Sequence, residues 1–213
     1  RGSLGFGKEF ADALHGKIGD LDVNDCINLI KASTKQIEKL DENNIALYGG
    51  SHGGFLGGAL IGHPEFHNLQ KCAVLRNPVL NFPFMITATD IPDWVATECG
   101  IPTFQAMPEH KNARNITEED MAHLWKISPR ANVHNVTAAV MLTLGDCDQR
   151  VPPAQGYEYA MELRALGNVK EDNIEVYHYK EDGHSLASPE ASAHGAIAAA
   201  KFMLKHTIGL GGY

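Results

Sequence analysis

The sequence predicts an α/β fold, with a mainly parallel β-sheet that carries helices on both of its faces. Two observations predict it: short apolar runs bounded by polar or turn residues, and helical patterns between these runs. The four runs are residues 45–48, 72–75, 138–144 and 174–177. Strands that alternate with helices are typical of βαβ units, whose parallel strands end at one edge of the sheet. We therefore expect a functional site at that edge.

Periodicity and capping residues indicate three of the helices. The first precedes residues 45–48, and its apolar stripe is Val23, Ile27, Ile30, Thr34 and Ile37. A second begins after Thr117, whose oxygen can cap free N–H groups and which three acidic residues follow. The last helix opens at Ser188 and Pro189 and stops at Gly209. Its apolar stripe is Ala193, Ile197, Ala200 and Leu204.

Residues 82–126 interrupt the alternation of strands and helices. This stretch holds four prolines and no clear strand pattern. The prolines are Pro83, Pro92, Pro102 and Pro108. We interpret the stretch as an insertion of short helices that lies over the site.

Composition and charge exclude several classes of protein. The 213 residues carry a net charge of −8, and their lysines and arginines occur without a run of three. A protein that binds nucleic acid needs a positive face, so no nucleic-acid partner is expected. No apolar run reaches the roughly 18 residues of a membrane span, so no membrane partner is expected. The four cysteines form no CxxC pair, which predicts reduced thiols in a cytoplasmic protein.

The clearest motif is the stretch Gly-Gly-Ser-His-Gly-Gly at residues 49–54, which contains G-x-S-x-G around Ser51. It follows a predicted strand and precedes a helical stretch, the context in which this motif lifts a nucleophilic hydroxyl above a sheet edge. Gly49 and Gly53 are expected to leave space where side chains would collide in so sharp a turn. The backbone N–H of His52 is then a candidate oxyanion donor at a helix N-terminus.

The residues around the glycine-rich motif disfavour two other interpretations of it. An incidental serine in a glycine-rich turn is disfavoured by the strand before it and the helix after it. A phosphate-binding loop is disfavoured because no Gly-Lys-Ser/Thr follows and no GxGxxG is present.

The partners of a serine nucleophile are expected in the order acid, then histidine. Asp146 and Asp148 both follow the third apolar run, and the residues alone leave that choice open. Among the eleven histidines, His184 alone lies directly after the last predicted strand and before the last helix. It is therefore the candidate general base.

The sequence predicts neither a metal nor an organic cofactor. His63 and His67 have the spacing of a helical metal pair, but Pro64 interrupts that helix and no HExxH motif is present.

The sequence resembles the prolyl oligopeptidase family of serine peptidases and, more narrowly, the acylaminoacyl-peptidases (acyl-peptide hydrolases). The matching stretches are residues 1–7, 49–55, 76–79, 89–94 and 145–152, and the resemblance runs to about residue 204. It implies an α/β-hydrolase fold and a catalytic triad. In this family the acid lies two positions before an arginine.

The residues that match this family pattern form a catalytic and a substrate-binding set. The resemblance implies that Ser51, Asp148 and His184 are catalytic and that Arg150 holds a substrate carbonyl. Arg76, which follows the second predicted strand, is a further candidate for substrate binding.

The resemblance also implies an activity. The expected substrate is a short peptide with an acylated N-terminus, cleaved through an acyl-enzyme to release an N-acyl amino acid. The alternatives are an esterase or lipase of the same fold and a catalytically silent hydrolase-fold binding protein. The resemblance leaves room for a homo-oligomer formed through the full-length protein.

A final expectation concerns the N-terminus. Family members resemble a β-propeller joined to a hydrolase domain, and a His-Gly-Gly-Pro-like segment supplies their second oxyanion donor. Because both would precede residue 1, residues 1–213 are expected to be a catalytic domain incomplete at its N-terminus, without the first strands of the sheet. Alone, these residues are expected to fold poorly and to be nearly inactive.

Overall fold

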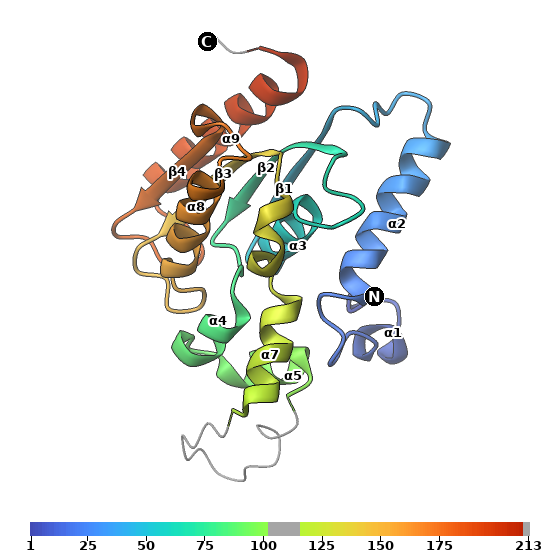
Figure 1. Cartoon of the computed structure of the whole chain (residues 1–213), viewed down its shortest axis with the longest axis vertical. Helices are drawn as coiled ribbons and strands as arrows, with labels where there is room; N and C mark the ends of the chain where they lie inside the picture. The colour runs from blue at the N-terminus through green and yellow to red at the C-terminus, as the bar shows by residue number, and fades with distance from the viewer. Residues whose placement is uncertain (102–115, 211–213) are drawn as a thin grey trace.

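The computed structural model describes residues 1–101 and 116–210 and contains a four-stranded parallel sheet (Figure 1). The strands lie side by side in sequence order, and every neighbouring pair is parallel. They are β1 (Ile45–Gly50), β2 (Gln70–Arg76), β3 (Ala139–Gly145) and β4 (Ile174–Tyr179). All four predicted strands and their parallel pairing are confirmed. Since the strands are parallel, their carboxyl ends share one edge of the sheet.

Helices connect the strands and cover the sheet. The α-helices are α1 (Lys8–Asp12), α2 (Leu21–Gln36), α3 (His52–Ile61), α4 (Phe82–Ala88), α5 (Pro92–Cys99), α7 (Glu118–Ile127), α8 (Ala154–Leu166) and α9 (Pro189–Ile208). Two short 3₁₀ helices are η1 (Pro129–Asn135) and η2 (Glu171–Asn173). Within the described residues, no helix combines the length and the apolar character that crossing a membrane requires.

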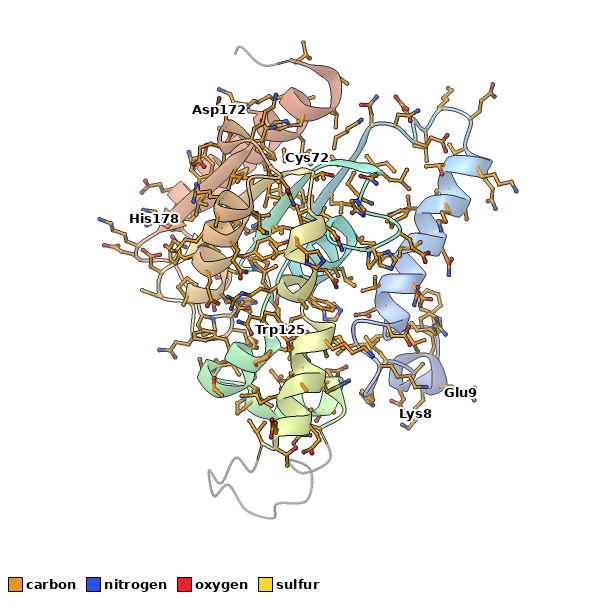
Figure 2. The ribbon with its side chains drawn as sticks, viewed as in Figure 1. Lys8, Glu9, Cys72, Trp125, Asp172 and His178 are labelled. Atoms are coloured by element: carbon orange, nitrogen blue, oxygen red, sulfur yellow. The ribbon has the colours of Figure 1, made fainter. Side chains whose placement is uncertain are left out.

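The two central strands, β2 and β3, are buried on both faces, as their apolar runs predicted, whereas the edge strands β1 and β4 are partly exposed. Cys72 and Val74 of β2 pack with Phe202 of α9 on one face. Leu75 of β2 packs on the other face in a cluster that includes Tyr159 of α8. Figure 2 shows Cys72 inside the molecule, whereas Lys8 and Glu9 project outwards from α1. Because successive strand residues point to opposite faces, both faces need a helical cover.

The predicted stripe of α2 is only partly buried. Val23 and Ile27 are buried in the cluster that also holds Phe55 of α3, and Ile30 packs against it. Ile37 lies just beyond the end of the helix and is half-exposed. The first turns of the helix thus pack against the core, whereas its last residues extend beyond the core.

The ends of α9 agree with the prediction, but its buried face does not. Ser188 caps the helix by accepting from the Ala191 N–H, and Gly209 ends it with a left-handed φ of 73°. The predicted stripe is wrong, since Ile197 is 58% exposed and Leu204 is 44% exposed. The helix instead buries Ala191, Ala199 and Phe202. It is apolar on more than one side, and the small alanines let it approach the sheet closely.

The predicted insertion consists of short helices in its described parts. Helices α4, α5 and α7 form a group at the lower end of the molecule in Figure 1. Thr117 forms the predicted cap of α7, and the side chain of Asp120 completes a capping box. Residues 82–101 and 116–126 contain no strand. Pro102 and Pro108 lie outside the described residues.

Candidate active site

Ser51 occupies a strained turn between β1 and α3. Its φ of 55° and ψ of −119° are unusual for a residue with a side chain, and such conformations cost about 1–3 kcal/mol. The N–H of Ser51 donates to the Arg76 carbonyl at 2.9 Å, which ties the turn to the end of β2. Helix α3 begins at His52, so Ser51 lies at a helix N-terminus.

The turn requires glycine at two positions, and one of them was not predicted. A Cβ on Gly49 would lie 2.2 Å from the Gly53 carbonyl oxygen. A Cβ on Gly54 would lie 2.7 Å from Cβ of Pro78. Gly53 has no such neighbour within 4 Å, so its predicted steric role is wrong. The close approach comes one residue later, where α3 packs against the chain that follows β2.

His184 joins Ser51 to a carboxylate. Its Nε2 lies 2.9 Å from Oγ of Ser51, and its Nδ1 lies 2.8 Å from Oδ2 of Asp148. An ionised carboxylate can only accept, so Nδ1 carries the proton and Nε2 is left to accept from the serine hydroxyl. The three side chains come from separate loops at the carboxyl ends of β1, β3 and β4. They form the hydrogen-bonded line that acyl transfer to a serine requires.

Asp148 is buried and fully bonded. Its side chain has no exposed area, and Oδ1 accepts the N–H groups of Arg150 and Val151, both at 2.9 Å. With the bond from His184, the carboxylate has three donors, which a buried charge needs. The backbone therefore fixes the direction in which this carboxylate faces His184.

Asp146, the other acid candidate, lies in a different set of contacts. It accepts from the Tyr157 hydroxyl at 2.8 Å and pairs with Nδ1 of His178 at 3.2 Å. Partial burial raises the pKa of Asp146, but these two bonds outweigh it and leave that pKa below its ordinary value. Burial, together with the bond to Asp146, raises the pKa of Tyr157 to about 12. His178 lies at the outer edge of the molecule on β4 (Figure 2). Asp146 is thus paired with His178, and the acid that contacts His184 is Asp148.

His52 turns its side chain to a second buried carboxylate. Its Nε2 lies 3.0 Å from Oδ2 of Asp22 in α2. Asp22 is 5% exposed and also accepts the N–H groups of Gly19 and Val23. The pairing of Asp22 with His52 was not predicted, because an acid in the first turn of a helix is ordinary and gives no sign of a distant partner.

The two arginines proposed for the substrate both have protein partners. Arg150 forms a two-pronged ion pair with Asp90, at 2.8 and 3.2 Å. This pair raises the pKa of Arg150 and lowers that of Asp90. Arg76 donates to the Ser185 carbonyl at 3.3 Å, so it contacts the histidine loop. A role in substrate binding stays a prediction for both.

His63 and His67, whose spacing resembles a helical metal pair, make local contacts instead. Nδ1 of His67 donates to the His63 carbonyl at 2.9 Å, and Nδ1 of His63 accepts the Glu65 N–H at 3.2 Å. Over residues 1–101 and 116–210, no group of three or more His, Cys, Asp or Glu side chains is placed to hold a metal ion.

Comparison with known proteins identifies relatives over nearly the whole chain. A family model described as the prolyl oligopeptidase family matches residues 1–209. The acylamino-acid-releasing enzyme of Rattus norvegicus is 35% identical over 207 residues, which are 97% of this chain and 26% of the rat protein. The Homo sapiens enzyme of that name is 33% identical, with the same two coverages. The chain thus spans about a quarter of the length of these relatives.

Solved structures share the fold. The acylaminoacyl peptidase of Pyrococcus horikoshii matches with a TM-score of 0.81 at 20% identity, over 97% of this chain and 31% of that one. A puromycin hydrolase matches with a TM-score of 0.81 at 20% identity, over 98% and 28%. These likenesses confirm the α/β-hydrolase class of the sheet and its helices.

Proposed function

The chain belongs to the prolyl oligopeptidase family, and on this premise we propose that residues 1–213 form the catalytic domain of a serine peptidase acting on short N-acylated peptides. The observation that carries the proposal is the hydrogen-bonded line from Ser51 through His184 to Asp148. The relatives named acylamino-acid-releasing enzymes support the substrate class.

The first half of the proposed reaction forms an acyl-enzyme. Oγ of Ser51 attacks the carbonyl carbon of the N-acylated first residue of the peptide, while Nε2 of His184 takes the hydroxyl proton. Asp148 stabilises the imidazolium that forms. The carbonyl oxygen becomes an oxyanion, to which the backbone N–H of His52 donates at the start of α3. The C–N bond then breaks as His184 gives its proton to the leaving amine.

The second half of the reaction restores the enzyme. Water attacks the ester carbon, and His184 accepts a proton from that water. The bond to Oγ of Ser51 breaks, the serine takes the proton back from His184, and the N-acyl amino acid leaves.

Arg150 is the proposed substrate-binding side chain of the acid loop. It lies beside the site because its own N–H donates to Asp148, and its side chain is 45% exposed. Asp90 occupies part of its donor set but leaves further N–H groups of the guanidinium for a peptide carbonyl. Arg76 uses one N–H on the Ser185 carbonyl, which likewise leaves further N–H groups of its guanidinium for the substrate.

A cytoplasmic location is part of the proposal. All four cysteines of the sequence are free thiols. Free thiols are the usual state in a reducing compartment. They are Cys26, Cys72, Cys99 and Cys147.

The test compares three chromogenic substrates with the full-length protein. We expect hydrolysis of acetyl-alanine p-nitroanilide, at least about 10-fold slower hydrolysis of alanine p-nitroanilide with a free amine, and no activity in Ser51→Ala. A preference for p-nitrophenyl butyrate over the acylated anilide would favour an esterase instead. No turnover of any of the three would contradict a catalytic role.

A further inference from the structure

Asn77 lies buried at the end of β2, where the catalytic loops meet. It is 2% exposed and has a φ of 39°, in the left-handed region. Asparagine is among the few residues with a side chain that adopt this region readily. Its backbone N–H donates to the Thr143 carbonyl at 2.8 Å, which fixes it against β3.

The side-chain amide of Asn77 connects two loops that follow other strands. Its Oδ1 accepts the N–H of Gly145, at the end of β3, at 2.8 Å. Its Nδ2 donates to the carbonyls of Gly183 and His184, at 3.3 and 3.0 Å. Gly145 begins the loop that carries Asp148. One amide therefore bonds the acid loop and the histidine loop at the same time.

These two loops are also in direct backbone contact. A Cβ on Gly145 would lie 2.6 Å from the carbonyl oxygens of both Asp182 and Gly183. The N–H of Cys147 donates to the Asp182 carbonyl at 3.0 Å. The carbonyls of Asp182 and Gly183 therefore lie close against the end of β3, and Asn77 bonds the carbonyl of Gly183 and the one that follows it, that of His184.

The nucleophile depends on the same strand end. The N–H of Ser51 donates to the carbonyl of Arg76, the residue before Asn77. The neighbouring guanidinium of Arg76 donates to the Ser185 carbonyl at 3.3 Å. Residues 76 and 77 thus contact all three segments that bring Ser51, Asp148 and His184 together.

We propose that Asn77 is a positioning residue of the triad: its amide holds the acid loop and the histidine loop in the alignment that places the His184 imidazole between Asp148 and Ser51. The inference rests on the proposed function, because it concerns how that triad is aligned. An amide suits the position, since it offers an acceptor to the Gly145 N–H and donors to two carbonyls. A carboxylate has no donor, and an aliphatic side chain has neither group.

The first test is Asn77→Gly in the full-length protein. Glycine tolerates the left-handed φ, so this change removes the side-chain bonds without straining the backbone. We expect kcat for acetyl-alanine p-nitroanilide to fall about 100-fold, because small misplacements of a catalytic group cost this much. KM should change less than about threefold, since no group proposed to bind substrate is removed. Amide hydrogen exchange over residues 143–151 and 180–188 should rise at least about 10-fold.

The matched control is Asn135→Gly. Asn135 is half-buried and donates to the Gly62 carbonyl at 3.1 Å, away from the three loops. The Asn135→Gly substitution should lower Tm while kcat stays within about twofold of the wild type. That result would separate a general loss of stability from a loss of alignment.

A second variant, Asn77→Asp, keeps the size and the acceptor but replaces the donor. Its carboxylate would face the carbonyls of Gly183 and His184, and only the protonated form could donate to them. The loss of kcat relative to the wild type should therefore grow as the pH rises from about 6 to 9, in assays at a temperature well below the Tm of both proteins. If Asn77→Gly does not fold, a flat ratio over this pH range would overturn the proposal.

The outcomes for Asn77 and for the peptidase activity are distinguishable. Wild-type kcat and wild-type exchange in Asn77→Gly would overturn the positioning role and leave the positive φ as the only reason for asparagine. If the wild-type protein does not hydrolyse the acylated anilide, the proposed function fails. The exchange experiment then decides alone whether Asn77 aligns the two loops.

Discussion

Two histidine–carboxylate pairs flank Ser51, and only one of them reaches it. The His184 side chain is 30% exposed and lies 2.8 Å from the carboxylate of Asp148, whose side chain has no exposed area. The His52 side chain is 31% exposed and lies 3.0 Å from Asp22, which is 5% exposed. In burial and in distance the two pairs are nearly the same. They differ in the nitrogen that the carboxylate occupies. Asp148 bonds Nδ1 of His184, which leaves Nε2 for Ser51, whereas Asp22 bonds Nε2 of His52.

The difference comes from the element that carries each histidine. His184 lies in a loop beyond β4, so its ring can place Nδ1 on Asp148 and Nε2 on Ser51. His52 is the first residue of α3, and its ring contacts Phe55 and Trp94 with centroids 5.3 and 6.2 Å apart. Its Nε2 is taken by the carboxylate of α2. A histidine beside a buried acid is therefore no sufficient sign of catalysis, because its place at the sheet edge decides its role.

The same substitution in both carboxylates tests this comparison most strongly. For Asp148→Asn, we expect kcat to fall about 10⁴-fold, because an amide can hold the wrong tautomer of His184. Steady-state kinetics with acetyl-alanine p-nitroanilide would measure it. A loss below about 10-fold would place the acid elsewhere.

Asp22→Asn should have a much smaller effect on the reaction. An amide oxygen can still accept the Gly19 N–H, but the partner of His52 changes from a charge to a neutral group. We expect kcat to fall about 10-fold, through movement of the His52 N–H, and the free energy of unfolding to fall by about 1–3 kcal/mol. A loss of kcat equal to that of Asp148→Asn would show that the second pair takes part in the chemistry.

Asp90→Asn tests the exposed ion pair beside the triad. Asp90 and Arg150 are 40% and 45% exposed in their side chains, and exposed pairs contribute about 0–1 kcal/mol. We expect KM for the acylated anilide to change less than about fivefold and kcat to stay within about twofold. Arg150→Lys should raise KM more, since lysine lacks the planar donor set. Equal effects of the two changes would mean that Asp90 also contacts the substrate.

Asp146→Asn should have the smallest effect and a distinct pH dependence. The pKa of Asp146 is lowered on folding, so the charged carboxylate stabilises the fold above its unfolded pKa of about 3.9. That contribution is lost as the pH falls through the folded pKa. We expect Tm at pH 7 to fall slightly, kcat to stay within about twofold, and the difference in Tm to disappear in acid. A difference in Tm that grows as the pH falls would have the wrong sign.

The features that were predictable from the sequence depend on neighbouring residues. Each strand is a local apolar run, and the turn at Ser51 is a local motif between two such elements. The caps at Thr117 and Ser188 follow the same logic. Since parallel strands end at one edge, three loops could be expected to converge there before any distance was known.

The features that were missed depend on contacts between distant segments. Asn77 and His184 are 107 positions apart, and Asp22 and His52 are 30 apart. Neither bond leaves a pattern in its own segment. The buried face of α9 was missed because the helix offers apolar residues on several sides, and only the sheet selects among them.

Mass spectrometric mapping of a fluorophosphonate adduct in the full-length protein would identify the nucleophile and its base together. We expect a single adduct, on Ser51, formed at least about 10³-fold more slowly in His184→Ala. An adduct on another serine, or labelling of Ser51 at the wild-type rate in His184→Ala, would show that these two residues do not form the catalytic pair.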